Sequence, residues 1–219
     1  MSIRGLLLGT AVGDSLGLPR EGLSRRRAAR MYPGPLRQRL LFHRGMLSDD
    51  TEHACMTAQA LLAAGDDPRR FARVLAWKLR WWLLGLPAAV GWGTLRAIAR
   101  SWVGFSPRRS GVWSAGNGAA MRAPIIGAWV QDLDQIGRFV EASTLLTHRD
   151  PRALAGAVAV AIAAHHAVHA APVAPARVLR DIRRHVADPE LLTAVDQVEA
   201  ALDCDHTPAR LAGTLGLAD

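Results

Sequence analysis

Helix-forming segments separated by glycine and proline account for almost the whole chain. The segment 51–64 is rich in helix formers, and the segment 71–84 spaces Trp77, Trp81 and Leu84 so that they share one helical face. Breakers such as Gly65 and Pro68 stand between these segments. No segment shows the alternation of polar and apolar residues that is typical of a strand. Further helices are expected at 94–102, 133–145, 151–170, 176–185 and 189–202.

This pattern predicts an all-α fold. The chain has 219 residues, of which 50% are hydrophobic, so it is long and apolar enough for one large core. The composition does not shift sharply along the chain, and the sequence contains no repeats. We therefore expect a single compact multi-helix domain over residues 1–219.

The sequence does not predict a membrane-spanning segment, because no run of 18 or more apolar residues is free of charge. The apolar stretch 5–12 resembles part of a secretory signal, but Gly9 interrupts it and no clear cleavage site follows. We interpret it as the first buried helix and expect a cytoplasmic protein. Cys55 and Cys204 are too few to form a disulfide framework.

The formal net charge is +8, and Lys78 is the only lysine, so the excess is carried by arginine. The arginines are scattered, apart from a cluster at 25–30, and no ladder of aromatic residues is interleaved with them. A nucleic-acid partner is therefore not expected. A negatively charged, phosphorylated substrate would suit the excess charge.

The strongest local signal is Ser48-Asp49-Asp50-Thr51, which lies just before a predicted helix. These side chains have two interpretations. They cap the helix by accepting bonds from its first N–H groups, or their oxygen atoms bind a hard cation such as Mg²⁺ or Mn²⁺. The sequence leaves both interpretations open.

Three further segments carry residues of chemical interest. Gly13 and Gly17 allow close backbone approach to a ligand, and Glu21 follows in a predicted loop; an ordinary turn is the alternative. The small residues at 114–120 precede a predicted helix start, which favours anion binding or tight packing, but they form neither a Walker loop nor a dinucleotide fingerprint. In the segment 147–151, Pro151 is expected at the first helical position, with Asp150 as a candidate cap.

Three histidines follow in the next helical segment. His165 and His169 have the i, i+4 spacing of a zinc pair, and His166 lies beside them. Because no Glu or Cys is close in sequence, we expect exposed histidines and no zinc site.

The four motifs together resemble the ADP-ribosylglycohydrolase family, which includes the dinitrogenase reductase-activating glycohydrolases. The family patterns are Gly-x-x-x-Gly-Asp-x-x-Gly with a downstream Glu, Ser/Thr-Asp-Asp-Thr, Gly-Asn-Gly-x-x-Met-Arg, and Thr-His-x-x-Pro. They are matched in order by Gly9 to Glu21, Ser48 to Thr51, Gly116 to Arg122, and Thr147 to Pro151. The motifs cover about the first 150 residues, and the similarity continues more loosely to the end.

The resemblance implies an all-α globule with a cleft that holds two divalent cations, usually Mg²⁺. It implies that Ser48, Asp49 and Asp50 bind metal, and that Glu21, Asp49 and Asp50 are catalytic. The residues implied to bind substrate are Asp14, Ser114, Gly116, Asn117, Gly118, Met121 and His148. The expected activity is Mg²⁺-dependent removal of ADP-ribose from a modified protein or small molecule.

Two departures from the family pattern bear on this expectation. The family carries a second metal-binding motif, Asp-x-Asp-Thr, near its C-terminus, and the segment 203–207 resembles it only superficially. We therefore expect the N-terminal two-thirds of such a domain, without its last helices. Ala89 stands where arginine-directed members tend to carry Asp, which argues against arginine-linked substrates. The alternative is a catalytically inactive or truncated relative with a binding or structural role.

Overall fold

The structure is a computed structural model that describes residues 2–40, 42, 44–87, 90–170, 172–204 and 208–215. These residues form helices joined by loops, with one isolated bridge between Val112 and His148 and no strand, which confirms the all-α fold. The helices are α1 (Ile3–Gly17), η1 (Leu18–Arg20), α2 (Arg25–Met31), α3 (Asp49–Ala64), α4 (Pro68–Leu84), α5 (Trp92–Trp102), η2 (Ala120–Arg122), α6 (Ala123–Trp129), α7 (Leu133–Thr144), α8 (Pro151–His169), α9 (Pro175–His185), α10 (Pro189–Asp203) and α11 (Pro208–Thr214).

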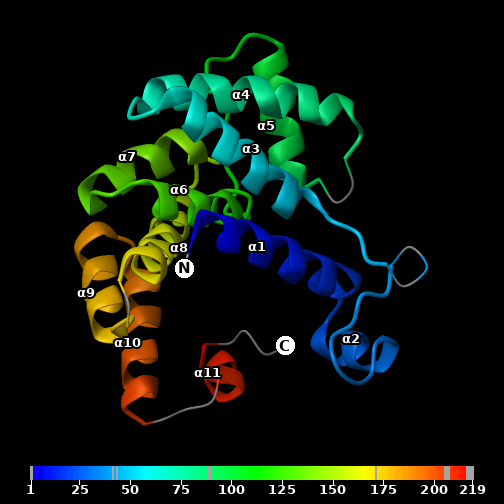
Figure 1. Ribbon diagram of the computed structural model, residues 1–219, viewed down its shortest axis with the longest axis vertical. Coiled ribbons are helices and arrows are strands. Elements are labelled where there is room, and N and C mark those ends of the chain that lie inside the picture. The colour runs from blue at the N-terminus through cyan, green and yellow to red at the C-terminus, as the bar shows by residue number, and fades with distance from the viewer. Residues whose placement is uncertain are drawn as a thin grey trace.

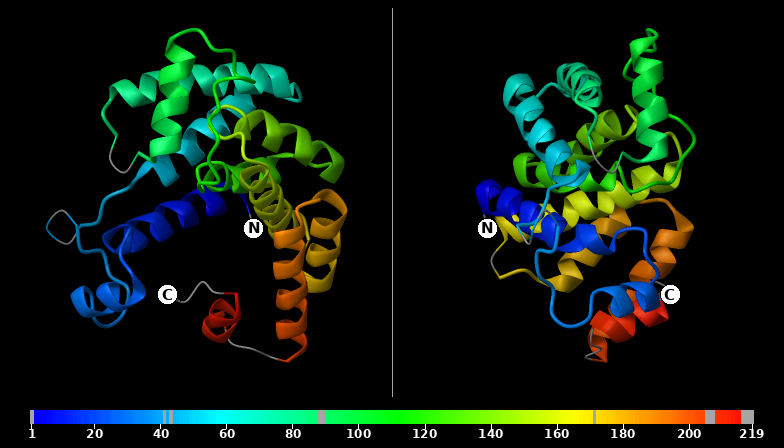
Figure 2. Two further views of the ribbon diagram at one scale, coloured as in Figure 1. Left: turned by 180° about the vertical axis from the view of Figure 1, so that it is seen from behind. Right: turned by 90° about the vertical axis from the view of Figure 1, so that its right-hand side faces the viewer.

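Helix α8 is the central element of the bundle (Figure 1). It packs against α6, α7 and α9, while α3 packs against α1, α4 and α6. Helix α10 runs beside α9, and α11 follows beyond its far end (Figure 2). The predicted metal-binding motif therefore begins a helix that contacts both the N-terminal helix and the core.

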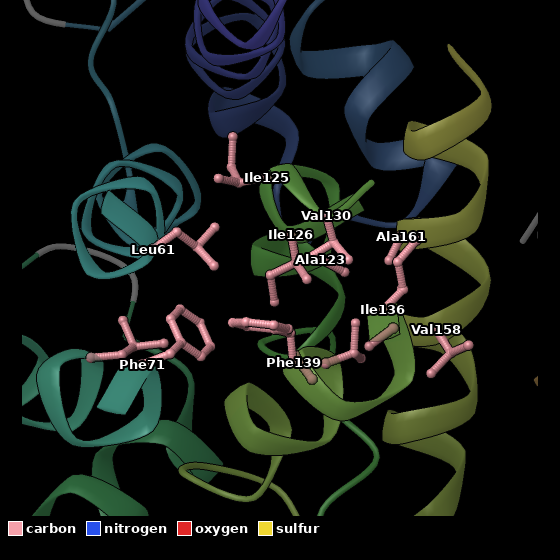
Figure 3. Close-up of a cluster of buried hydrophobic side chains, with 14 of the residues drawn as sticks. Leu61, Phe71, Ala123, Ile125, Ile126, Val130, Ile136, Phe139, Val158 and Ala161 are labelled. Atoms are coloured by element: carbon pink, nitrogen blue, oxygen red, sulfur yellow. The ribbon is translucent and has the colours of Figure 1, made fainter. Parts of the chain in front are cut away.

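The core is built from the apolar faces of α3, α4, α6, α7 and α8 (Figure 3). On α4, the buried residues Phe71, Leu75 and Leu79 recur every four positions, as expected for one face of a helix. The Phe71 ring meets that of Phe139 from α7 with 5.6 Å between centroids. These contacts hold α4 and α7 side by side.

Aspartate followed by proline starts three of the long helices. Asp67, Asp150 and Asp188 cap α4, α8 and α10, and each accepts a bond from a backbone N–H of the first turn. The proline that follows each cap needs no hydrogen bond for its nitrogen at the first helical position. The helix starts predicted from Pro151 and Pro189 are confirmed.

The backbones of α6 and α8 come unusually close at Gly127. A Cβ atom on this residue would lie 1.9 Å from the carbonyl oxygen of Ala161 and 2.7 Å from its carbonyl carbon. Helix α6 spans only seven residues and includes Gly127; a helix start was expected after the small residues 114–120, but the extent of this helix was not predicted. The close approach explains the glycine, because no side chain fits between the two helices.

The expected burial of the first helix was wrong. Helix α1 includes the stretch 5–12, but the helix fully buries only Ser15, and Leu8 and Val12 are 59% and 54% exposed. The predicted Trp77–Trp81–Leu84 face is present on α4, and all three side chains are exposed, because the opposite face of α4 packs into the core.

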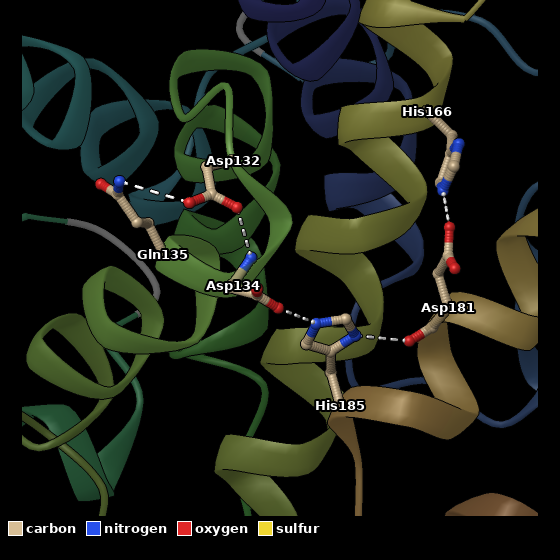
Figure 4. A network of polar contacts seen from close by, with 6 residues as sticks. All are labelled: Asp132, Asp134, Gln135, His166, Asp181 and His185. Atoms are coloured by element: carbon tan, nitrogen blue, oxygen red, sulfur yellow. Dashed lines mark hydrogen bonds and ion pairs between the residues drawn. The ribbon is translucent and has the colours of Figure 1, made fainter.

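The expected exposure of His165 and His166 was also wrong, since both are buried. His166 Nε2 lies 2.8 Å from Asp181 Oδ2, which joins α8 to α9, and His185 links Asp134 of α7 to the Asp181 carbonyl (Figure 4). His165 and His169 bind the carbonyls of Val130 and Ala128. The histidines therefore tie helices together by hydrogen bonds.

By length and composition alone, α8 is apolar enough to cross a membrane, so the sequence-based exclusion of any such segment was too strict. Its position explains its composition. The helix lies between α6, α7 and α9, and its buried residues include Ala157, Ala161 and Ile162. A core helix of a bundle is expected to be apolar on several sides.

We expect Gly127→Ala to lower the free energy of unfolding by about 3 kcal/mol or more, because the methyl group would force α6 and α8 apart. The matched control is Gly156→Ala on α8, where an added Cβ meets nothing within 4 Å. That change should raise stability slightly, since alanine favours the helix. Urea unfolding checks both variants, and equal effects would contradict the close approach.

Candidate functional site

The carboxylate of Asp14 joins α1 to the start of α3. Its Oδ2 accepts a bond from the Ser48 backbone N–H at 2.8 Å, and its Oδ1 accepts from the Ser48 hydroxyl at 2.7 Å. The N–H and hydroxyl of Thr51 also donate to Oδ2. Ser48 Oγ in turn accepts from the Asp50 N–H at 3.3 Å and caps the helix. These contacts fix the backbone that carries Asp49 and Asp50.

Four acidic residues, Asp14, Glu21, Asp49 and Asp50, gather at this helix start, and we call them the acidic cluster. Burial raises the pKa of Asp49 to about 7, and the charges of Asp50 and Glu21 add to the shift. Burial and the Asp14 charge raise the pKa of Asp50. Burial, followed by the charges of Asp50 and Asp14, raises the pKa of Glu21. The carboxylates therefore repel one another in a partly desolvated site.

The chemistry of the acidic cluster suits a hard divalent cation. Ser48, Asp49 and Asp50 offer oxygen donors, and their raised carboxyl pKa values show negative charge that a cation would neutralise. The described part of the chain contains no group of three or more His, Cys, Asp or Glu side chains arranged around a metal position. Mg²⁺ commonly takes only one or two carboxylates and completes its shell with water, so the residues present fit it.

The guanidinium of Arg122 lies beside the acidic cluster and is fully buried. It donates to Ser143 Oγ at 2.9 Å, to the Ser143 carbonyl at 3.0 Å and to Thr147 Oγ1 at 2.8 Å. Burial lowers the pKa of Arg122 to about 10, while the charge of Asp49 opposes that shift. Arg122 thus stays cationic at neutral pH and partly offsets the charge of Asp49.

His53 packs against this arginine, four residues after Asp49 on α3. Its Nδ1 lies 3.4 Å from Arg122 Nη1, and its ring meets Trp82 edge-on with 4.4 Å between centroids. Burial, with the charges of Arg122 and His148, lowers the pKa of His53 well below its usual value. The imidazole is therefore neutral, and its Nδ1 accepts from the guanidinium.

His148 lies on the other side of Arg122, next to Thr147. The Thr147 hydroxyl makes two hydrogen bonds. Its oxygen accepts a bond from Arg122, and its O–H donates to His148 Nδ1 at 2.7 Å. Burial, followed by the Arg122 charge, lowers the pKa of His148 to about 4, so its ring is neutral at pH 7. In this arrangement Nε2 carries the remaining proton and is a hydrogen-bond donor.

Three glycines surround the His148 ring. A Cβ atom at Gly118 would lie 2.8 Å from His148 Cε1, and one at Gly116 would lie 3.3 Å from Nε2. A Cβ at Gly93, on α5, would lie 2.9 Å from Ser114 Oγ and 3.6 Å from His148 Nε2. The glycines of the Gly-Asn-Gly motif are required here because the backbone passes so close to the imidazole.

The structure thus brings the predicted residues together in two groups with Arg122 between them. One group is the acidic cluster with Ser48, and the other is His148 with Ser114, Gly116 and Gly118. Asn117 is exposed and Met121 is half-buried within the same segment. Ala89 and residues 205–207 lie outside the described residues.

Sequence reasoning did not assign a role to Arg122 or to His53. Arg122 is the last residue of the Gly-Asn-Gly-x-x-Met-Arg motif, and this position could have identified it as a candidate site residue. His53 follows Asp49 by four positions and so shares its helical face. Nothing in the sequence indicates that the two residues meet, because 69 positions separate them.

Comparison with known proteins gives consistent matches. A sequence model of the ADP-ribosylglycohydrolase family matches residues 2–218. An uncharacterized protein of Archaeoglobus fulgidus is 38% identical over 167 residues, which cover 73% of this chain and 53% of the relative. The uncharacterized protein YegU of Escherichia coli is 32% identical over 185 residues, which cover 76% of this chain and 54% of the relative.

A solved structure described as an ADP-ribosylglycohydrolase-related protein complex is similar to this fold. It has a TM-score of 0.64 and 27% identity, and the match covers 89% of this chain and 65% of that one. The chain spans about half the length of the curated relatives it matches.

The raised pKa of Asp49 predicts a stability that falls as pH rises. The folded chain holds the Asp49 proton more tightly than the unfolded chain, so the ionised carboxylate destabilises the fold from about pH 4 through about pH 7. Between pH 5 and pH 8 in EDTA, wild type should lose roughly 1–2 kcal/mol more than Asp49→Asn. Urea unfolding measures this difference. The exposed Asp66→Asn serves as the control, and equal pH slopes for the three proteins would refute the prediction.

A second prediction concerns the close fit at Gly118. Gly118→Ala should push the His148 ring toward solvent and raise the pKa of His148 from about 4 toward its usual value. NMR titration of the imidazole measures the shift. Gly137→Ala, on an open face of α7, should leave it unchanged. An unchanged His148 titration in Gly118→Ala would show that the glycine is not needed to seat the ring.

Proposed function

The chain belongs to the ADP-ribosylglycohydrolase family, and we propose that it hydrolyses the glycosidic bond that attaches ADP-ribose to a protein or small molecule. The observation that carries this proposal is the pairing of the acidic cluster with a glycine-lined histidine, joined by the buried Arg122. The carboxylates would stabilise the positive charge that develops on the reacting sugar, and the glycine-rich segment would bind the rest of the nucleotide.

The carboxylates have a direct role in such a reaction. Cleavage at ribose develops positive charge at the anomeric carbon, which Glu21, Asp49 or Asp50 would stabilise. A carboxylate close to the anomeric carbon can also accept a proton from the attacking water. Asp14, whose carboxylate is engaged by Ser48 and Thr51, contributes by positioning the others.

The second group would bind the nucleotide part of the substrate. The neutral His148 offers a donor at Nε2, and the backbone of Gly116 and Gly118 approaches a ligand without obstruction from side chains. Ser114, Asn117 and Met121 belong to the same segment and complete the proposed binding surface. We assign this surface to the ribose and diphosphate of ADP-ribose.

We further propose that Ser48, Asp49 and Asp50 hold Mg²⁺, or Mn²⁺ in its place. A cation held there would supply positive charge for the sugar and a polarised water. The Ser48 hydroxyl donates its proton to Asp14, which leaves a lone pair for a ligand bond. The expected second ion of the family would share this acidic site.

A catalytically inactive relative with a binding role is the second candidate. One observation favours it: the described residues provide no group of three or more His, Cys, Asp or Glu side chains around a metal position. Such a protein would still bind ADP-ribose through the His148 group. Binding and turnover must therefore be measured separately.

Titration calorimetry with ADP-ribose, in Mg²⁺ and then in EDTA, tests the proposed site. Wild type should bind in Mg²⁺, and both EDTA and the double change Asp49→Ala with Asp50→Ala should weaken binding at least tenfold. The matched control changes the same charge elsewhere, with Asp66→Ala and Glu141→Ala, both exposed. Folded protein that shows no binding in any condition would refute the proposal.

Release of ADP-ribose from serine-linked and arginine-linked model peptides then separates the two candidates. We expect turnover of the serine-linked peptide in Mg²⁺, because Ala89 replaces an acidic residue typical of arginine-directed members. Magnesium-dependent binding without release from either peptide would support the inactive relative instead.

A further inference from the structure

A cavity of about 400 Å³ opens beside the isolated bridge, and we call it the arginine pocket. Three arginines and one tryptophan line it, and no aspartate or glutamate does. Its lining residues are Arg96, Arg100, Gly111, Val112, Trp113 and Arg149. By contrast, a second cavity with three arginines also contains Asp67 and Glu141, so its charge is largely compensated. The volume of the arginine pocket falls within the range of ligand sites.

The arginine pocket lies on the opposite side of the bridge from the His148 ring. Val112 and Thr147 form the backbone hydrogen bonds of this extended pairing, together with Arg149. Successive side chains of an extended segment point to opposite sides. The His148 imidazole faces Gly116 and Gly118, whereas Arg149 lines the arginine pocket. The arginine pocket and the His148 ring therefore lie on opposite sides of this extended pairing.

One arginine of the pocket is held by contacts with the protein, and two are exposed to solvent. Arg100 Nη2 donates to the Arg109 carbonyl at 2.9 Å, and its guanidinium lies over the Phe105 ring at 4.4 Å. Its Nε is buried and makes no hydrogen bond with the described residues. Arg96 and Arg149 are exposed, and neither forms an ion pair within the described part of the chain. The pocket thus carries a positive charge that no protein group neutralises.

An aromatic ring completes the pocket. Trp113 is 73% exposed, so its indole face is available to a ligand. Guanidinium groups bind phosphate oxygens, and an exposed indole stacks on a nucleobase. An acidic peptide would use the arginines but would gain nothing comparable from the indole. The combination favours a nucleic-acid strand, which presents phosphates and bases together.

We propose that the arginine pocket binds single-stranded nucleic acid, with a base on Trp113 and backbone phosphates on Arg96, Arg100 and Arg149. The proposal goes beyond the proposed glycohydrolase function and does not depend on it. Sequence analysis did not predict such a surface, because only the fold brings Trp113 and the arginines together, from α5, the 111–113 loop and position 149.

Fluorescence anisotropy with a labelled oligothymidylate of eight nucleotides tests the proposal. Three phosphate contacts predict a slope of about −2 for the logarithm of affinity against the logarithm of salt concentration. Arg96→Ala with Arg149→Ala should weaken binding at least tenfold and flatten that slope. The control pair, Arg177→Ala with Arg184→Ala on α9, removes the same exposed charge and should change affinity less than twofold.

Trp113 variants separate a strand from other anions. Trp113→Ala should weaken oligonucleotide binding about tenfold, and Trp113→Phe should retain most of it. Equal losses in the control pair, or full competition by polyglutamate with no effect of Trp113→Ala, would overturn the proposal. Competition by free AMP as strong as that of the oligonucleotide would also overturn it, since the pocket would then serve a mononucleotide.

Two further measurements distinguish this pocket from the proposed glycohydrolase site. The double change Asp49→Ala with Asp50→Ala should leave oligonucleotide affinity unchanged, and excess ADP-ribose should not displace the strand. Displacement by ADP-ribose would place the ligand in the glycohydrolase site and overturn a separate strand-binding pocket. Failure of ADP-ribose to bind at all, with oligonucleotide binding intact, would refute the proposed function alone.

Discussion

The buried guanidinium of Arg122 is the interaction on which the site depends. It is one of the largest fully buried side chains, and it links His53 on α3 with Ser143 on α7 and with Thr147 before α8. An arginine without bonding partners in such a position would be severely destabilising, so its hydrogen bonds hold these three parts of the chain in one arrangement. The same bonds orient His148 through Thr147 and put a positive charge near Asp49.

The acidic cluster lowers the stability of the fold while providing carboxylates for binding or catalysis. Burying several carboxylates near one another costs free energy, which is visible in the raised pKa values of Glu21, Asp49 and Asp50. Asp14 offsets part of that cost by bonding to Ser48 and Thr51. A strained acidic site of this kind is typical of positions kept for binding or catalysis rather than for packing.

Much of the fold followed from local pattern, and the misses have physical reasons. Long periodic segments and the Asp-Pro starts identified α8 and α10 because helix starts are set by neighbouring residues. The extent of the short α6 was not predicted, because Gly127 lowers the helix propensity of this segment, and the glycine is required by the close approach of Ala161 on α8. The site motifs could be recognised because each is a short continuous stretch of sequence. The contact of Arg122 with His53, and the shared pocket of Trp113 and Arg149, could not be predicted because they join residues far apart in sequence. The burial of His166 was likewise not predictable, because its partner Asp181 lies on another helix, α9.

The Asp14 contacts also make the acidic site depend on the local stability of α1. They join Asp14 to Ser48 and Thr51, which lie 34 and 37 residues later in the chain. Asp14 belongs to α1, and Ser15 is the one residue that this helix buries fully. A helix held by so little apolar contact opens at a lower free energy than the core. If α1 opens in this way, Ser48 and Thr51 lose their acceptor while α4, α7 and α8 remain packed. The amide protons around the acidic site are therefore expected to exchange with solvent well before those of the central bundle.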